Sequence, residues 1–284
     1  MTIDMRLRPP LQSWKSTAQF KEGTAYYPTR YGFPRPKSVG TQDIGDLLAE
    51  MDEADITWGV VMGRQSAPPH GIVPNEEISD FVRQHADRFV GFAGIDLRDI
   101  DKAVADLDGY ARSDEFKGIS IEPGAGFVPL YSDDPSLFPL YERAQELQLP
   151  LSITLSGYLS SMAGHPTSYG NPSPVATVAR KFPRLKIVVS HAAWPNVMPM
   201  LEVAFLHDNV YVSPDLYMNH VHTPGAHEYI NAAKFYLADR LLFGTAYPSR
   251  PLKESVAGFR QWDLDSELAE KILHRNAARL LGLE

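Results

Sequence analysis

The chain has 284 residues, of which 44% are hydrophobic and 11% aromatic, enough to bury the core of one large domain or two smaller ones. Its 35 acidic and 27 basic side chains give a formal charge of −8, and no basic run stands out, so we expect no nucleic-acid partner. The lack of cysteine excludes disulfides, cysteine-based zinc sites and thiol nucleophiles. We find neither a signal-peptide pattern nor an apolar run long enough to span a bilayer, so we expect a cytoplasmic protein with no membrane partner.

The first alternating stretch predicts a strand over residues 3–8, with Asp4, Arg6 and Arg8 on one face. Residues 10–40 follow with little periodicity but many aromatic side chains. Loops of this length in a compact domain are usually functional covers or disordered segments. The aromatic content favours an ordered lid over the carboxyl end of the first strand.

From residue 45 onward, helical and extended patterns alternate. Helical spacing predicts helices over 45–54, 74–87, 101–113, 135–147, 174–182, 195–207, 226–235 and 267–283. Further strands are predicted over 57–63, 89–96, 116–122, 149–156, 187–189, 209–215 and 240–248. Eight strands alternating with helices predict an α/β protein, a (β/α)8 TIM barrel with residues 1–284 as a single domain. A doubly wound sheet is the alternative, but the missing Gly-x-Gly-x-x-Gly disfavours its dinucleotide-binding form.

Polar side chains gather at the predicted carboxyl ends of the strands, where parallel α/β folds carry their chemistry. They are Arg64, Glu122, Thr154, Ser156, His191, Asp215 and Tyr217. Guanidinium groups bind carboxylates through two parallel hydrogen bonds, so Arg6, Arg8 and Arg64 predict an anion site. The alternative is that Arg6 and Arg8 only pair with neighbouring acids.

His191 follows a short β-branched strand and predicts a general base, oriented by Asp215 or Glu122. The side chains of Tyr217, Thr154 and Ser156 are candidate donors to a developing oxyanion. Hydroxyl groups inside a barrel are also often no more than satisfied core groups, so both interpretations stay open for these three residues.

Four motifs, in order along the chain, resemble those of the amidohydrolase superfamily. They are Ile3-Asp-Met-Arg-Leu-Arg-Pro9 for its Asp-x-His-x-His strand, Ser190-His191-Ala192 for its later strand-end histidine, Leu242-Phe-Gly-Thr-Ala-Tyr-Pro248 for its Phe-Gly-Ser-Asp-Tyr-Pro strand, and Ile272-Leu-His-Arg-Asn-Ala-Ala-Arg-Leu-Leu281 for its closing helix. The branch that the chain resembles is the amidohydrolase-related one, which is like aminocarboxymuconate-semialdehyde decarboxylase. The resemblance implies a (β/α)8 barrel that acts on small, often carboxylated substrates.

The resemblance also locates the family's metal ligands, and most of them are replaced here. Its first-strand histidines fall at Arg6 and Arg8, its fifth-strand histidine near Thr154 and its eighth-strand aspartate at Ala246, so only His191 remains. A catalytic transition metal needs about three protein ligands, and arginine cannot coordinate. We therefore expect no metal and no other cofactor, while a divalent metal at another position stays open.

These observations predict a metal-independent hydrolase acting on a small carboxylated substrate such as a lactone. Arg6, Arg8 and Arg64 would hold the carboxylate, and His191 would activate water. A decarboxylase or hydratase of a small carboxylic acid, that is a lyase, is the first alternative. A non-catalytic anion-binding barrel is the second. A homo-oligomer stays open.

Overall fold

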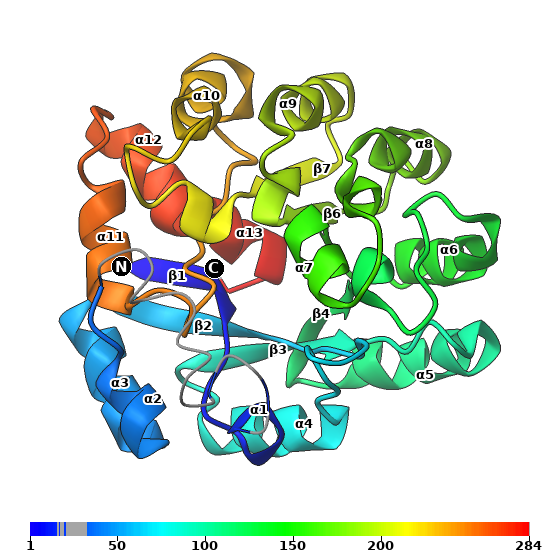
Figure 1. Cartoon of the computed structure of the whole chain (residues 1–284), viewed down its shortest axis with the longest axis horizontal. Helices are drawn as coiled ribbons and strands as arrows, with labels where there is room; N and C mark the ends of the chain where they lie inside the picture. Colours follow the sequence, from blue (N-terminus) through cyan, green and yellow to red (C-terminus); the bar gives the residue numbers. More distant parts are fainter. Residues whose placement is uncertain (16, 18–19, 21–32, 284) are drawn as a thin grey trace.

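The computed structural model describes residues 1–15, 17, 20 and 33–283 of the chain. Within these residues, seven parallel strands form one sheet in chain order. The strands are β1 (Thr2–Leu7), β2 (Ile56–Met62), β3 (Phe89–Gly94), β4 (Phe116–Ile121), β5 (Leu151–Thr154), β6 (Ile187–Ser190) and β7 (Val210–Ser213). The strands gather at the centre of the molecule and the helices surround them (Figure 1). The α/β class is confirmed.

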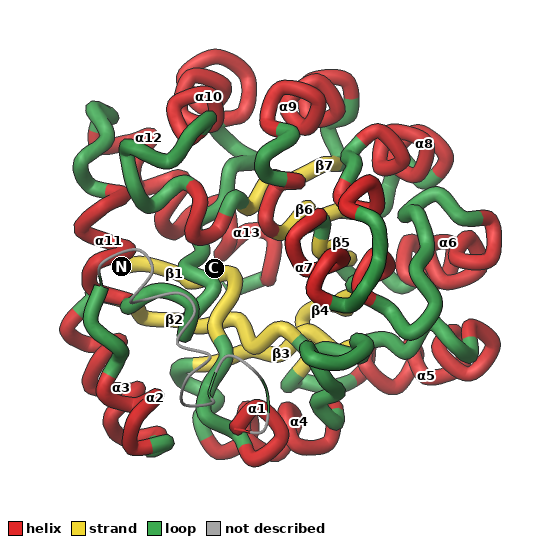
Figure 2. Tube along the Cα trace, in the orientation of Figure 1, coloured by secondary structure: helices red, strands yellow, loops and turns green. Residues whose placement is uncertain are grey.

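Helices connect successive strands and cover the outside of the sheet, as Figure 2 shows. They are α3 (Ile44–Glu53), α4 (Asn75–Gln84), α5 (Ile100–Arg112), α6 (Phe138–Glu146), α8 (Ser173–Lys181), α9 (Val197–Leu206) and α10 (Ala226–Ala232). The shorter or terminal helices are α1 (Gln12–Lys15), α2 (Lys37–Thr41), α7 (Gly157–Met162), α11 (Leu252–Phe259), α12 (Ser266–Glu270) and α13 (Asn276–Leu281). Short 3-10 turns cover Pro123–Ala125, Pro135–Leu137, Thr167–Gly170, His191–Ala193 and Asp215–Tyr217, and π turns cover Ala233–Leu237 and Lys271–Arg275.

Two of the connecting helices, α3 and α5, begin at a polar side chain that caps them. The Asp43 carboxylate accepts a hydrogen bond from the backbone N–H of Asp46 at the start of α3. Asp99 does the same for Lys102 at the start of α5. Such caps satisfy backbone donors that have no partner inside the helix. In α3, Leu47 then points into the core between the sheet and the helices.

The predicted eighth strand over residues 240–248 is not a strand. Isolated bridges join Leu241 to β7 and Tyr247 to β1, so the segment still lies between the first and last strands. Its middle departs from extended structure for two reasons. The Thr245 backbone N–H donates to the Asp4 side chain, at 2.9 Å, instead of to a neighbouring strand. Ala246 has a φ of 56°, which turns the chain away from the sheet.

A second apolar cluster lies apart from the main core. Side chains of β1, β2, β3 and β6 meet those of α13 in it. Its members include Met5, Met62, Phe92, Val188 and Leu280, all fully or almost fully buried. The strands that precede the polar side chains are therefore packed against one another through this apolar cluster.

About half of the predicted lid over residues 10–40, namely residues 16, 18–19 and 21–32, lies outside the described residues. Of the part that is described, α1 carries Trp14, which is fully buried. The rest of the lid stays a prediction. Among the described residues, no helix is long and apolar enough to cross a membrane.

Candidate active site

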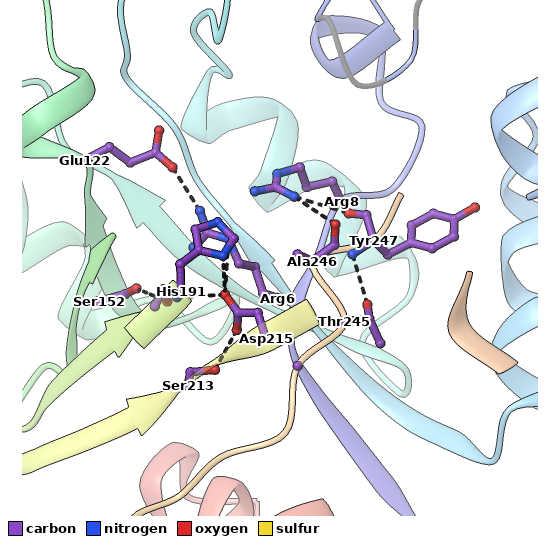
Figure 3. Close-up of polar contacts among 12 residues, drawn as sticks. Arg6, Arg8, Glu122, Ser152, His191, Ser213, Asp215, Thr245, Ala246 and Tyr247 are labelled. Carbon is purple, nitrogen blue, oxygen red and sulfur yellow. Dashed lines mark hydrogen bonds and ion pairs between the residues drawn. The ribbon is translucent and has the colours of Figure 1, made fainter. Parts of the chain in front are cut away.

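Seven side chains from the ends of six strands form the candidate site, and Figure 3 shows most of them converging. They are Arg6 in β1 and Arg8 directly after it, Arg64 after β2, Glu122 after β4, Thr154 at the end of β5, His191 after β6 and Asp215 after β7. All seven are buried. The structure thus brings together most of the residues that the sequence singled out.

Glu122 joins two of the arginines. Its Oε1 accepts from Nη2 of Arg6 at 2.9 Å and from Nη2 of Arg64 at 2.9 Å. Its Oε2 accepts from Nε of Arg64 at 2.8 Å and from the Ser66 hydroxyl at 2.6 Å. Burial opposes ionisation of Glu122, yet its pKa lies well below the usual value because Arg64 and Arg6 stabilise the carboxylate. Glu122 therefore orients arginines, and its described partners do not include His191.

Asp215 is the acid that contacts His191. Its Oδ2 lies 3.1 Å from Nδ1 of His191, accepts from the His191 backbone N–H at 3.0 Å, and lies 3.8 Å from Nε of Arg6. The Ser213 hydroxyl donates to Oδ1 at 2.7 Å (Figure 3). A Cβ atom at Gly244 would lie 2.7 Å from that same oxygen, so only glycine fits beside it. Despite burial, the pKa of Asp215 is lowered by His191 and Arg6.

His191 is neutral near neutral pH in the resting site. Burial lowers the pKa of its imidazole, and so does the nearby charge of Arg6, while Asp215 works in the opposite direction. The backbone is also unusual here, because His191 has a φ of 62° and Asp215 a φ of 54°. Non-glycine residues in this region store strain, and such residues cluster at functional sites.

Arg8 has no carboxylate partner among the described residues. Its Nη1 donates to the backbone carbonyls of Ala246 at 3.2 Å and Tyr247 at 3.4 Å, and its side chain is almost completely buried. Burial lowers the pKa of Arg8 well below its usual value, and the charges of Arg6 and Arg64 lower it further. The indole ring of Trp14 lies 5.5 Å from the Arg8 guanidinium and 5.3 Å from that of Arg64. Arg8 is thus a buried cation that still lacks its anion.

The charges of the cluster do not balance. Three guanidinium groups face two ionised carboxylates, Glu122 and Asp215, and one carboxyl group, Asp4, that is only partly ionised at neutral pH, so the cluster keeps a net positive charge. Four buried nitrogens of these arginines also lack a hydrogen-bond partner among the described residues: Nε and Nη1 of Arg6, Nε of Arg8 and Nη1 of Arg64. Buried donors without partners are costly and uncommon. The arrangement suits one monovalent anion with several acceptor oxygens.

The three hydroxyl residues have different surroundings. The Thr154 hydroxyl is buried and has no hydrogen-bond partner among the described residues. The Ser156 hydroxyl instead accepts from the Leu159 backbone N–H at 3.2 Å and caps α7, which gives it a structural task. The Tyr217 ring stacks on the Trp194 ring, with 4.5 Å between the ring centroids, and packs edge-on against the His191 ring, with 5.9 Å between the centroids.

Asp4 is a buried acid to which the sequence assigned no separate role. Its carboxylate accepts from the backbone N–H of Arg6 at 3.0 Å, from that of Thr245 at 2.9 Å and from the Thr245 hydroxyl. Burial raises its pKa from 3.8 to about 7, although the Thr245 hydroxyl works in the opposite direction. At neutral pH Asp4 therefore adds only a partial charge to the cluster.

The raised pKa predicts how Asp4 affects stability. The folded protein holds the Asp4 proton more tightly than the unfolded chain, so the stabilisation is complete below pH 3.8 and is lost as the pH rises to about 7. We expect the free energy of unfolding of the wild type to fall over this pH range, whereas that of Asp4→Asn does not carry this contribution. One pKa unit corresponds to about 1.4 kcal/mol, so the wild type should lose a few kcal/mol relative to the variant. Urea unfolding of both proteins across this pH range measures the difference. A difference that is constant with pH would contradict the prediction.

His70 was missed by the sequence reasoning, which followed strand ends only. It lies in the loop after β2, near Arg64 and Glu122, and it is fully buried. Trp14 was noted only as one of the lid aromatics. The signal that finds both residues is burial of a polar atom, which the sequence pattern does not report.

Comparisons with known proteins agree on one family. The family model described as amidohydrolase matches residues 3–283. γ-Resorcylate decarboxylase of Polaromonas sp. is 24% identical over 253 residues, which cover 74% of this chain and 75% of that protein. The solved structure of an uncharacterised TIM-barrel protein from Bordetella bronchiseptica is 33% identical, with a TM-score of 0.91 over 99% of this chain and 98% of that one. A dihydroxybenzoic acid decarboxylase from Polaromonas sp., crystallised with manganese and the inhibitor 2-nitroresorcinol, is 19% identical, with a TM-score of 0.67 over 99% of this chain and 97% of that one.

These relatives correct two predictions. The similar proteins of known activity are decarboxylases, so the prediction of a lactone hydrolase is wrong and the lyase alternative is favoured. Arginines bind a substrate carboxylate equally well when the reaction removes the carboxylate and when it leaves the carboxylate unchanged. The arginines therefore do not identify which bond of the substrate breaks. The expectation that no cofactor is involved is contradicted by the manganese in the Polaromonas structure.

Proposed function

The chain belongs to the amidohydrolase family, and from that membership we propose that it is a lyase that removes carbon dioxide from a small hydroxylated aromatic acid. The observation that carries the proposal is the buried arginine cluster, which keeps a net positive charge and has four buried nitrogens without a hydrogen-bond partner among the described residues. A benzoate carboxylate has the charge and the acceptor oxygens that this cluster lacks. The decarboxylase activity of the relatives supports the choice of reaction.

The wider architecture enters the proposal as well. We take the fold as a (β/α)8 barrel in which residues 240–248 stand in place of the eighth strand, with residues 1–284 as one domain. The backbone hydrogen bonds of this segment to both neighbours support that interpretation. The Leu242 N–H donates to the Val212 carbonyl at 2.9 Å, and the Met5 N–H donates to the Phe243 carbonyl at 3.0 Å. In such barrels the site lies at the carboxyl ends of the strands.

Manganese does not fit the side chains present at this centre. Among the described residues, no group of three or more histidine, aspartate or glutamate side chains is placed to hold a metal ion. Arg6 already lies between the two carboxylates, with Nη2 2.9 Å from Glu122 and Nε 3.8 Å from Asp215. A divalent ion in that position would be repelled by the guanidinium. Because relatives contain manganese, activity is to be measured with and without it.

Removal of the carboxylate requires a proton at the ring carbon. The bond to the carboxyl carbon breaks, carbon dioxide leaves, and the electron pair that stays on the ring takes up a proton. Hydroxyl groups beside that carbon make it basic enough to accept the proton. His191 is the proton carrier in the proposal: its imidazolium form gives up one proton and becomes neutral, so charge and atoms balance.

Substrate binding charges His191. The positive charges of Arg6 and Arg8 help to hold the pKa of His191 down in the resting site, and burial does so more strongly. A bound carboxylate offsets the charge of Arg8, so it raises the pKa of His191 and favours uptake of the proton that the reaction consumes. Asp215, 3.1 Å from Nδ1, stabilises the imidazolium and holds the ring in place.

A substrate panel tests the proposal. γ-Resorcylate carries two hydroxyl groups beside its carboxylate, salicylate carries one and benzoate none. Release of carbon dioxide from γ-resorcylate, slower release from salicylate and none from benzoate is the expected order. A protein that releases no carbon dioxide from any hydroxybenzoate, with or without manganese, would overturn the proposal.

Arg8→Lys is expected to weaken carboxylate binding while leaving the fold intact. Lysine keeps the charge but loses the planar fork, so one charge-assisted hydrogen bond of about 1.5–3 kcal/mol is lost, which corresponds to roughly 10- to 100-fold in affinity. Calorimetric titration with benzoate and salicylate measures the loss. Arg260→Lys is the matched control, because Arg260 is exposed and pairs only with the exposed Asp55 at 3.2 Å in the described residues. Equal binding by wild type and Arg8→Lys would contradict the role given to Arg8.

A further inference from the structure

His70 lies in a loop that is tied to the candidate site on several sides. The loop begins at Ser66, whose hydroxyl donates to Glu122 at 2.6 Å. The Ala67 backbone N–H donates to the carbonyl of Ala125, in the turn after β4, at 3.0 Å, and the His70 backbone N–H donates to the carbonyl of Ala67 at 3.0 Å. The His70 ring is fully buried, so the loop holds it in one place.

The two ring nitrogens of His70 have opposite surroundings. Nε2 lies 2.8 Å from the backbone carbonyl oxygen of Leu159 in α7. A carbonyl oxygen only accepts, so Nε2 carries the proton and donates it. Nδ1 is buried and has no hydrogen-bond partner among the described residues.

The neutral ring leaves Nδ1 as an acceptor. Burial, together with the nearby charge of Arg64, lowers the pKa of His70 to about 4. With the proton on Nε2, Nδ1 presents a lone pair and nothing else. A buried acceptor without a donor costs about 1–3 kcal/mol, which calls for a donor other than those of the described residues.

We propose that Nδ1 of His70 accepts a hydrogen bond from a ring hydroxyl of the bound aromatic acid, which makes His70 a specificity-determining residue. The inference rests on the proposed function for the class of ligand. Carboxylates and carbonyl oxygens are excluded as partners of Nδ1, because they bring no proton. A hydroxyl group does bring a proton. Arg64 influences His70 electrostatically, and its Nη1 has no hydrogen-bond partner among the described residues, so it is available to donate to the hydroxyl oxygen or to the carboxylate.

Two substitutions separate the two nitrogens of His70. His70→Gln places an amide N–H where Nε2 was, so it keeps the hydrogen bond to Leu159 and loses the acceptor. His70→Asn places an amide oxygen where Nδ1 was, so it keeps the acceptor and loses the bond to Leu159. Thermal unfolding of both variants reports whether the loop is still anchored.

The test compares binding of 2-nitroresorcinol with binding of 2-nitrophenol, which lacks one of its two hydroxyl groups; the former inhibits a relative. Neither ligand can lose carbon dioxide, so the result is independent of turnover. The wild type and His70→Asn are expected to prefer 2-nitroresorcinol by about tenfold, and His70→Gln is expected to lose the preference. The inference is overturned if His70→Gln keeps the preference, or if the wild type shows none or binds neither ligand. Failure of the proposed function would appear separately, as a lack of carbon dioxide from the hydroxybenzoates.

Discussion

Replacing Glu122 by glutamine is expected to lower the free energy of unfolding by about 3–5 kcal/mol. The wild-type carboxylate accepts hydrogen bonds from Arg6, Arg64 and Ser66 in a buried site. Glutamine keeps the shape but removes the negative charge and turns an N–H group toward one of these donors. Three buried guanidinium groups would then face only Asp215 and the partly ionised Asp4 among the described carboxyl groups of the cluster. Removing one partner of a buried ion pair is costly because the other charge stays buried without compensation.

Urea unfolding of Glu122→Gln and the wild type measures this loss. Glu146→Gln is the control: Glu146 pairs with Arg143 at 2.7 Å, but its side chain is half exposed, so the change is expected to stay below about 1 kcal/mol. If Glu122→Gln were as stable as Glu146→Gln, the arginine cluster would not depend on Glu122 for its charge balance.

His191→Asn is expected to reduce turnover by about 10²- to 10⁴-fold, the usual range for loss of a general acid or base. Asparagine tolerates the left-handed backbone at this position, where φ is 62°, so the turn after β6 should persist. The amide cannot deliver a proton to the ring carbon. Carboxylate binding depends on Arg8 and its neighbours, so it should remain within a few-fold of the wild type.

Turnover and binding are measured separately for this variant. Carbon dioxide release from γ-resorcylate gives the rate, and calorimetry with benzoate gives the affinity. A rate close to that of the wild type would remove His191 from the proton transfer. Loss of binding together with loss of rate would instead point to a collapse of the turn between His191 and Ala193.

Much of the architecture follows from local sequence pattern. The β-branched run before His191 and the alternation in β1 both form strands, because their side chains fit the two faces of a packed sheet. The segment over residues 240–248 fails as a strand because the Asp4 side chain takes the Thr245 backbone N–H and Ala246 adopts a positive φ. Neither interaction is encoded by neighbours in the sequence.

The candidate site was predictable as a set but not as pairs. The rule that strand ends meet at one edge places Arg6, Glu122, His191 and Asp215 together. The pairing of acids with His191 depends on distances between strand ends that are far apart in the sequence. The sequence therefore did not decide whether Glu122 or Asp215 contacts His191. Ser156 shows the same limit, because its hydroxyl caps α7 and a sequence does not distinguish a cap from a ligand contact.

The reaction was the least predictable part. Arginines at former metal-ligand positions led to the prediction of a metal-independent hydrolase, whereas the similar proteins of known activity are decarboxylases and several were crystallised with manganese. The chemistry of carboxylate binding is shared by both reactions, so residue types alone do not separate them.

Decarboxylation of carboxyl-labelled γ-resorcylate in heavy water tests the central claim most directly. The account predicts that labelled carbon dioxide is released and that the resorcinol product carries one deuterium at the carbon that held the carboxylate. Addition of water to the ring without loss of the label would identify a hydratase instead. Recovery of unchanged γ-resorcylate bound to the protein, with or without manganese, would leave an anion-binding barrel and contradict the account.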